Sequence, residues 1–134
     1  MPRRGELTLL TPLELREQGR PVEVLTFQHV VRSLLRNVSA HLRVHGGQSL
    51  EGVVDFRALK EASSMVTCTR DGTDWLRIER DSSRQQRTIP IDTRVGWLRF
   101  EGELEPFIPW LELGTVLGLG KGRSHGFGNM RWEQ

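Results

Sequence analysis

The chain has 134 residues, of which 37% are hydrophobic, so we expect a single globular domain over residues 1–134 with one core. The sequence contains no run of 18 uncharged apolar residues and no signal-peptide pattern, which predicts a cytoplasmic protein without a membrane partner. The formal net charge is only +2, but 17 of the 19 cations are arginines; they suit phosphate and base stacking, although arginines scattered over a solvated surface would give the same composition.

The N-terminal segment predicts a strand that ends in a turn. Residues 6–16 begin with an alternating pair, Leu7 and Leu9. Pro12 indicates an edge strand or a bulge, because proline lacks the N–H group that a ladder needs. Residues 17–23 then form a predicted turn.

Two helices are predicted next. Apolar residues recur every three or four positions over residues 27–42, which indicates an amphipathic helix capped by Thr26 and ended by Gly46. Three arginines lie on its opposite face, either as a solvated surface or as contacts to a polyanion: Arg32, Arg36 and Arg43. Asp55 is expected to cap a shorter helix over residues 56–65. Its inward side chains are expected to be Phe56, Leu59 and Met65.

Residues 65–80 and 86–102 predict a long β-hairpin. The first segment contains a predicted turn at Asp71 and Gly72, and the second alternates at Ile89 and Ile91. The polar tip "RDSSRQQR" joins the two segments. It either contacts RNA or protects a strand edge with these side chains: Arg80, Arg84, Gln85, Gln86 and Arg87.

The C-terminal part completes a ferredoxin-like pattern. Residues 105–118 predict a helix with Pro106 and Pro109 in its first turn, and residues 126–132 predict the last strand. The inward side chains of this helix are expected to be Phe107, Trp110, Leu111 and Leu117. The order βαββαβ, with an extra short helix after the first, is typical of an α+β ferredoxin-like fold with helices on one face of an antiparallel four-stranded sheet.

Four tryptophans are candidates for stacking on bases. Trp75, Trp97 and Trp110 occupy positions with core-like periodicity. Trp132 is therefore the tryptophan that we expect to be exposed.

The stretch "VLGLGKGRSHGFGNMRW" is rich in glycine. It does not fit a phosphate-binding Walker loop, because Thr115 and Gly122 stand where that motif needs glycine and a hydroxyl residue. A dinucleotide motif fails at Arg123. The stretch fits GxGxxxxxGxG, in which glycines allow main-chain N–H groups and two cations, Lys121 and Arg123, to meet a sugar-phosphate chain. The glycines are Gly118, Gly120, Gly122, Gly126 and Gly128, and a purely structural connection is the alternative.

Metal binding and catalysis have few candidates in the sequence. His41 and His45 have a spacing that zinc can use, but only Cys68 is a conceivable third ligand, and we expect no metal or other cofactor. Cys68 is expected to be a small buried residue on a strand. His125 lies among the loop cations, where it could contact RNA or transfer a proton.

Together these segments resemble the CRISPR-associated endoribonucleases of the RAMP superfamily (Cas6-like) that cut precursor CRISPR RNA. The resemblance is to their C-terminal domain and rests on residues 7–21, 27–47 and 82–114, and on the glycine-rich stretch 118–132. It implies a fold related to the RNA recognition motif, normally the second of two such domains that bind repeat RNA together. It also implies metal-independent cleavage that leaves a 2′,3′-cyclic phosphate, with the usual catalytic histidine in the N-terminal domain.

The resemblance carries over a basic position, Lys121, and four glycines, but no catalytic role for His125. We therefore expect a domain that binds CRISPR repeat RNA through Lys121, Arg123 and His125, with Arg84 and Arg87 of the hairpin tip. Two alternatives stay open. One is a complete small endoribonuclease, as a monomer or a homodimer, that uses His125 or His45. The other is an interaction module that docks on a separate N-terminal-type domain or on other CRISPR proteins.

Overall fold

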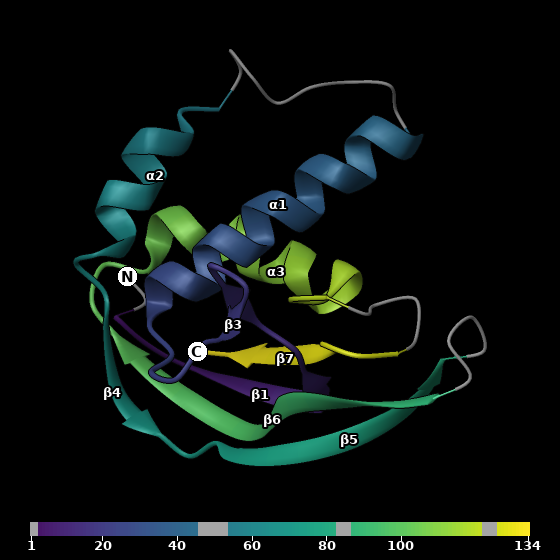
Figure 1. Ribbon diagram of the computed structural model, residues 1–134. Helices are drawn as coiled ribbons and strands as arrows, with labels where there is room; N and C mark the ends of the chain where they lie inside the picture. Colours follow the sequence, from purple (N-terminus) through teal and green to yellow (C-terminus); the bar gives the residue numbers. More distant parts are fainter. Residues whose placement is uncertain (1–2, 46–53, 83–86, 122–125) are drawn as a thin grey trace.

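The structure is a computed structural model that describes residues 3–45, 54–82, 87–121 and 126–134. Its elements follow in this chain order: β1 (Arg4–Leu13), β2 (Arg16–Glu17), β3 (Arg20–Pro21), α1 (Phe27–His45), α2 (Phe56–Ser63), β4 (Thr67–Asp71), β5 (Asp74–Ser82), β6 (Arg87–Glu101), the 3₁₀ turn η1 (Glu105–Phe107), α3 (Ile108–Leu117) and β7 (Met130–Glu133). The helices lie together on one face of the curved sheet (Figure 1). None of the helices in these described ranges is both long and apolar enough to cross a membrane.

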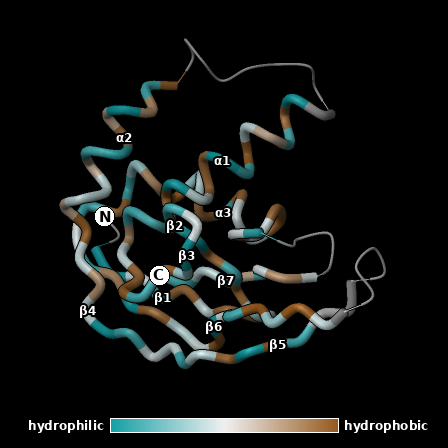
Figure 2. Tube along the Cα trace, viewed as in Figure 1, coloured by the Kyte–Doolittle hydropathy of each residue, from teal (hydrophilic) through white to brown (hydrophobic). Residues whose placement is uncertain are grey.

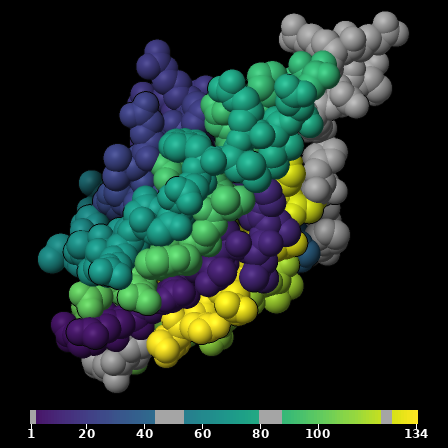
Figure 3. Space-filling model, turned by 90° about the horizontal axis from the view of Figure 1, so that it is seen from below, coloured from purple at the N-terminus to yellow at the C-terminus, as the bar shows by residue number. Residues whose placement is uncertain are grey.

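The strand order confirms the ferredoxin-like fold. Both β4 and β5 pair with β6, β6 pairs with β1, and β1 pairs with β7, always antiparallel. Figure 3 shows this order from below as adjacent teal, green, purple and yellow bands. The short strands β2 and β3 form a separate two-stranded sheet, which we call the ribbon (residues 16–21). The ribbon turns through Gln18 and Gly19, both at positive φ, as in the tight turns that join two antiparallel strands.

The core fills the space between α1, α3 and the sheet. Phe27 packs edge-on against Phe100 and Phe107, with ring centroids 5.0 and 5.1 Å apart. Hydrophobic residues recur along β1, β6 and α1, the elements that enclose this core (Figure 2). The apolar stripe predicted for α1 is buried from Phe27 to Val38 and half-buried at Leu42.

Both predicted N-terminal caps are present. The Thr26 hydroxyl accepts from the backbone N–H of His29 at 3.4 Å, and His29 Nδ1 accepts from the backbone N–H of Thr26 at 3.0 Å. This is the reciprocal arrangement of a capping box, with histidine in the place of the usual glutamate. At α2, Asp55 accepts from the backbone N–H of Ala58 at 3.0 Å.

Two local predictions are wrong, and a third is confirmed in one of its two alternatives. Met65 is 75% exposed, because α2 ends at Ser63 before its inward face continues. Pro12 does not lie in an edge strand, since β1 is flanked by β6 and β7; the bulge alternative is correct, as the register shifts between Leu9 and Leu13. The chain does not reverse at Gly72, because β4 and β5 both pair with β6.

The tryptophan predictions fail at three of four positions. Trp75 is 51% exposed, and Trp97 faces away from the core because it pairs with Thr8, next to the buried Leu98. Trp132 is not fully exposed: it packs against the core, and its ring occupies the space that a side chain at Gly5 would need. Trp110 is half-buried against the core, as its periodicity predicts.

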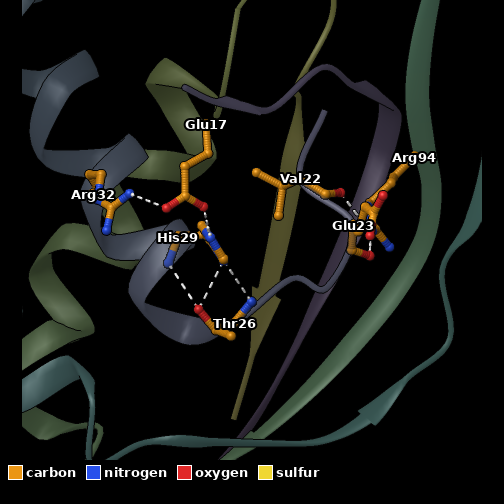
Figure 4. Close-up of polar contacts among 7 residues, drawn as sticks. All are labelled: Glu17, Val22, Glu23, Thr26, His29, Arg32 and Arg94. Carbon is orange, nitrogen blue, oxygen red and sulfur yellow. Dashed lines mark hydrogen bonds and ion pairs between the residues drawn. The ribbon is translucent and has the colours of Figure 1, made fainter. Parts of the chain in front are cut away.

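Arg94 joins β6 to the segment between β3 and α1. Its side chain is 6% exposed and donates to the carbonyl oxygens of Val22, at 2.8 Å, and Glu23. Figure 4 shows these contacts. Burial lowers the pKa of the Arg94 guanidinium and Asp71, 3.7 Å away, opposes that effect; the group stays charged because an arginine does not lose its proton in proteins. The guanidinium also lies over the ring of Trp75, 4.3 Å from its centroid.

Candidate nucleic-acid interface

The glycine-rich stretch packs largely against its own chain. Gly118 ends α3 at φ +81°. A Cβ atom on Gly120 would lie 2.2 Å from the Glu14 carbonyl oxygen, and one on Gly128 would lie 1.9 Å from that of Leu119. The expectation that Gly120 and Gly128 keep the backbone open to RNA is therefore wrong, since the domain itself fills that space.

The main-chain N–H groups of residues 118–121 are also occupied within the domain. They donate to these acceptors: Gly118 to Gly114 O at 2.8 Å, Leu119 to Gly128 O at 2.9 Å, Gly120 to Ser33 Oγ at 2.7 Å, and Lys121 to Glu14 O at 3.0 Å. The prediction that main-chain N–H groups contact a sugar-phosphate chain is thus wrong for these four residues. Of these four residues, only Lys121 offers a ligand an exposed side chain, since two are glycines and Leu119 is buried.

Two polar side chains hold this stretch on α1. Ser33 and Asn37 are 4% and 6% exposed, although both lie beside the apolar stripe of α1 and not at its positions. Asn37 Nδ2 donates to Gly118 O at 3.0 Å, and Ser33 accepts from Gly120 as described above. Because each buried polar group is satisfied, the exit of α3 is fixed against α1. Neither residue was predicted from the sequence, because a polar residue beside an apolar stripe is ordinarily part of the solvated face.

A cleft opens between α1, the ribbon and residues 120–121. Its volume is about 720 Å³, within the usual range for ligand sites of about 300–1,000 Å³. Among the described residues that line it there are three cations and no carboxylate, and we call it the cationic cleft. Its lining residues are Leu15, Arg16, Gln18, Gly19, Ser33, Arg36, Asn37, Ala40, Gly120 and Lys121.

Each cation of the cationic cleft comes from a different element. Arg16 lies in β2, Arg36 in α1, and Lys121 follows α3 in an isolated bridge with Glu14. Arg36 and Lys121 are exposed and form no ion pair with any residue of the described ranges. Arg16 donates to Gly19 O at 3.1 Å, and the Glu14 carboxylate lies 3.9 Å from its side chain. Like charges that converge in one hollow raise the local concentration of anions, so the cleft is suited to phosphate.

The ribbon, which forms one side of this cleft, is held to the first turns of α1 by side-chain contacts of Glu17. Glu17 accepts from His29 Nε2 at 2.7 Å and lies 3.5 Å from the Arg32 guanidinium (Figure 4). His29 Nδ1 already accepts from the Thr26 N–H, so the ring proton is on Nε2. The helix cap thus sets the tautomer of His29, and in this tautomer the Nε2–H group donates to Glu17.

Glu17→Gln is expected to remove a pH-dependent part of the stability. The hydrogen bond from His29, aided by the nearby charge of Arg32, holds the pKa of Glu17 below the usual glutamate value of 4.5. A lowered folded-state pKa stabilises the protein above pH 4.5, and this contribution is lost as the pH falls through that lowered value. Thermal unfolding between neutral and acid pH should show the variant less stable than wild type at neutral pH and equal to it in acid. Glu103→Gln, at an exposed carboxylate, is the control, and a constant difference at all pH values would contradict the prediction.

The described ranges contain only part of the predicted site. Lys121 is exposed and lines the cationic cleft, as expected for a basic contact. Gly122, Arg123, His125 and Arg84 lie outside the described residues, and so do the side chains of Arg87 and His45. Gly126 lies at φ +85° with open space around it, so the predicted open backbone is retained there.

The side chains that the sequence offered as conceivable metal ligands do not form a cluster in the described part of the chain. His41 is exposed on α1, and no group of three His, Cys, Asp or Glu side chains there could hold a metal ion. Cys68 is half-buried in β4 against the core, close to its expected role. Burial, followed by the charge of Asp71, raises the pKa of its thiol, which keeps the thiol protonated and a poor ligand.

The sheet face opposite the helices is less suited to a polyanion. Three of its arginines are paired with carboxylates: Arg4 with Glu101 at 2.7 Å, Arg99 with Glu6 at 3.1 Å, and Arg131 with Glu133 at 2.8 Å. This is the face that Figure 3 presents. Because positive and negative groups alternate there, the described residues of this face carry no excess of positive charge comparable to that of the cationic cleft.

Comparison with known proteins gives one family. A model of the family described as CRISPR-associated endoribonuclease Cas6 matches residues 7–130. Among curated proteins, no sequence matches the chain.

Solved structures show the same fold. A Cas6 product complex is 21% identical, with a TM-score of 0.64, over 99% of this chain and 52% of that one. A Thermus thermophilus Cas6 is 15% identical, with a TM-score of 0.67, over 98% of this chain and 55% of that one. A chain of a partial Cas6-RT-Cas1–Cas2 complex is 11% identical, with a TM-score of 0.66, over 99% of this chain and 22% of that one. The chain spans about half the length of the first two.

Proposed function

Because the chain belongs to the family of the CRISPR-associated endoribonuclease Cas6, we propose that it is the CRISPR repeat-RNA-binding domain of an endoribonuclease that processes precursor CRISPR RNA. The observation that carries the proposal is the cationic cleft, in which Arg16, Arg36 and Lys121 converge and the described lining residues include no carboxylate. Exposed cations that replace the counterions of a phosphate chain supply most of the non-specific affinity for nucleic acid.

The ribose-phosphate chain binds along the cationic cleft, between α1 and the ribbon. The polar groups of Ser33 and Asn37 are hydrogen-bonded to the glycine-rich stretch, so these two residues line the cleft without binding RNA. The contacts to phosphates come from the three cations. The positions predicted from the sequence, Arg123, His125, Arg84 and Arg87, extend the same proposal beyond the cleft.

The hairpin supports a second contact to the same RNA. β1 pairs with β6 only as far as Arg94, whereas β5 continues to pair with β6 down to Arg87. The outer half of the hairpin is therefore a two-stranded extension that projects past the rest of the sheet (Figure 1). Such an extension can enter a groove or a loop of folded RNA, and we assign this role to the tip that carries Arg84 and Arg87.

A further protein domain is part of the proposal. The solved Cas6 structures that resemble the chain are about twice its length, which supports an N-terminal-type domain as a partner, in the same polypeptide or as a separate protein. Other CRISPR proteins are the second partner class, since one similar chain stands in a complex named Cas6-RT-Cas1–Cas2.

Lys121→Ala is expected to weaken binding of single-stranded repeat RNA and to reduce the slope of log K against log salt by about 0.7, the value for one lost phosphate contact on a single strand. Fluorescence anisotropy at several salt concentrations measures both quantities. The control is Lys60→Ala, which removes the other lysine of the chain, exposed on α2 away from the cleft. If Lys121→Ala behaves like Lys60→Ala, the cleft is not the RNA site and the proposal fails.

A further inference from the structure

Trp75 is a large aromatic side chain left on the surface. It is 51% exposed in β5, where tryptophan is normally buried for most of its area. One face of its ring lies against the Arg94 guanidinium, 4.3 Å from the ring centroid. The domain therefore covers one side of the indole and leaves much of the other to a ligand.

The Trp75 ring is held rigidly for an exposed group. The guanidinium beneath it is buried and is fixed by the carbonyl oxygens of Val22 and Glu23 and by the Thr73 hydroxyl at 2.9 Å. A platform that is already ordered loses little conformational entropy when a ligand stacks on it. This separates Trp75 from a flexible surface side chain.

Trp75 lies in a hollow between β5, β6 and the ribbon. The hollow is lined by Arg20, Pro21, Glu23, Trp75, Arg77 and Asp92. Arg77 and Asp92 pair with each other at 3.0 Å. The other charged groups among the described lining residues are Arg20 and Glu23, one of each sign. The hollow therefore has no excess of positive charge there, and the group it offers to a ligand is the indole.

The ribbon separates this hollow from the cationic cleft. Arg16, Gln18 and Gly19 line the cleft, whereas Arg20 and Pro21 line the hollow. The two strands of such a ribbon are only about 5 Å apart, so a nucleic-acid strand that leaves the cleft reaches the indole by crossing it. Arg20, in the second strand of the ribbon, is placed to meet a phosphate on the way.

We propose that Trp75 is a base-stacking site for the single-stranded part of the RNA whose phosphates occupy the cationic cleft. The inference rests on the proposed function and adds a second contact of different chemistry to it. Stacking on an aromatic ring tolerates every base, because each base has a π face. The site therefore holds a nucleotide in place without reading its sequence.

The test uses a fluorescently labelled single-stranded RNA of mixed sequence and about 12 nucleotides, in the range of site sizes of single-strand-binding domains. Trp75→Ala is expected to weaken binding about tenfold, the usual effect of losing one stacked base, and to leave the salt slope unchanged because no charge is removed. Trp75→Phe should retain most of the affinity. Leu76→Ala, at the neighbouring exposed apolar residue, is the control and should bind like wild type.

A second measurement covers the case in which Trp75→Ala unfolds through loss of its contact to Arg94. RNA should quench tryptophan emission in wild type, and the quenching should be clearly smaller in Trp75→Phe at the same saturation. Normal affinity in a folded Trp75→Ala, or equal quenching in both proteins, overturns the stacking site and leaves the hollow to a protein partner. Because Lys121→Ala reports on the cleft separately, a failure of the stacking site is distinguishable from a failure of RNA binding.

Discussion

Gly128→Ala is expected to lower the free energy of unfolding by about 3 kcal/mol or more, and the melting temperature by about 10 °C. Gly128 lies at φ +77°, a conformation that is unfavourable for a residue with a side chain, and its new Cβ would lie 1.9 Å from the Leu119 carbonyl oxygen. The backbone cannot yield cheaply, because Gly128 donates to Pro12 O at 2.8 Å and accepts from Leu119 N at 2.9 Å. Thermal or urea unfolding measures the loss.

The matched control is Gly126→Ala in the same stretch. Gly126 has a similar φ of +85°, but nothing lies within 4 Å of a Cβ added there. Its substitution should cost only about 1 kcal/mol for the backbone conformation. If both variants lose the same stability, the close approach to Leu119 is not what requires glycine at position 128.

This comparison bears on what the glycine-rich stretch does. Its composition indicates that the backbone must approach something closely, but it does not identify the partner. For Gly120 the partner is the Glu14 carbonyl, contributed from the other end of the chain. The close contact between Gly120 and Glu14 depends on tertiary packing. The glycine spacing in the sequence therefore could not distinguish a contact with the chain's own backbone from a contact with a phosphate.

The elements themselves could be predicted because their signals are local. The stripe and the Thr26 cap of α1, the Asp55 cap of α2 and the prolines before and within the first turn of α3 all act over three or four residues. The βαββαβ order followed from them. The cationic cleft could be predicted only in part: Lys121 and Arg36 stood out, whereas Arg16 joins them through the bridge between Glu14 and Lys121.

The tryptophan error has a different cause. The alternation of Ile89 and Ile91, continued unbroken through β6, puts Trp97 toward the core. In the structure the two successive residues Thr93 and Arg94 are both buried, so the alternation shifts by one position and Leu98 becomes the core residue. A shift of one residue turns every following side chain to the other face of the sheet. Periodicity alone does not reveal such a shift.

Arg94→Met is expected to lower the free energy of unfolding by about 3 kcal/mol, because it leaves buried carbonyl oxygens without a donor. The Arg94 guanidinium serves both Val22 and Glu23, and it anchors the segment that leads from the ribbon into α1. Methionine fills a similar volume but donates no hydrogen bond. We expect a melting temperature about 10 °C lower, together with weaker RNA binding as the ribbon loses its anchor.

Arg99→Met is the matched control on the same strand. The Arg99 guanidinium also lies over a tryptophan, 5.1 Å from the Trp97 ring centroid, and pairs with Glu6 at 3.1 Å, but its side chain is 53% exposed. Water replaces such contacts readily, so the loss should stay below about 1 kcal/mol. The two arginines thus share the contact to a tryptophan ring but differ in burial and in the backbone carbonyl oxygens that Arg94 serves. A large loss of stability in Arg94→Met with a small loss in Arg99→Met assigns the cost to the buried carbonyl oxygens. Equal losses would assign the cost to the cation–π contact. In that case Arg94 would not be what fixes the ribbon.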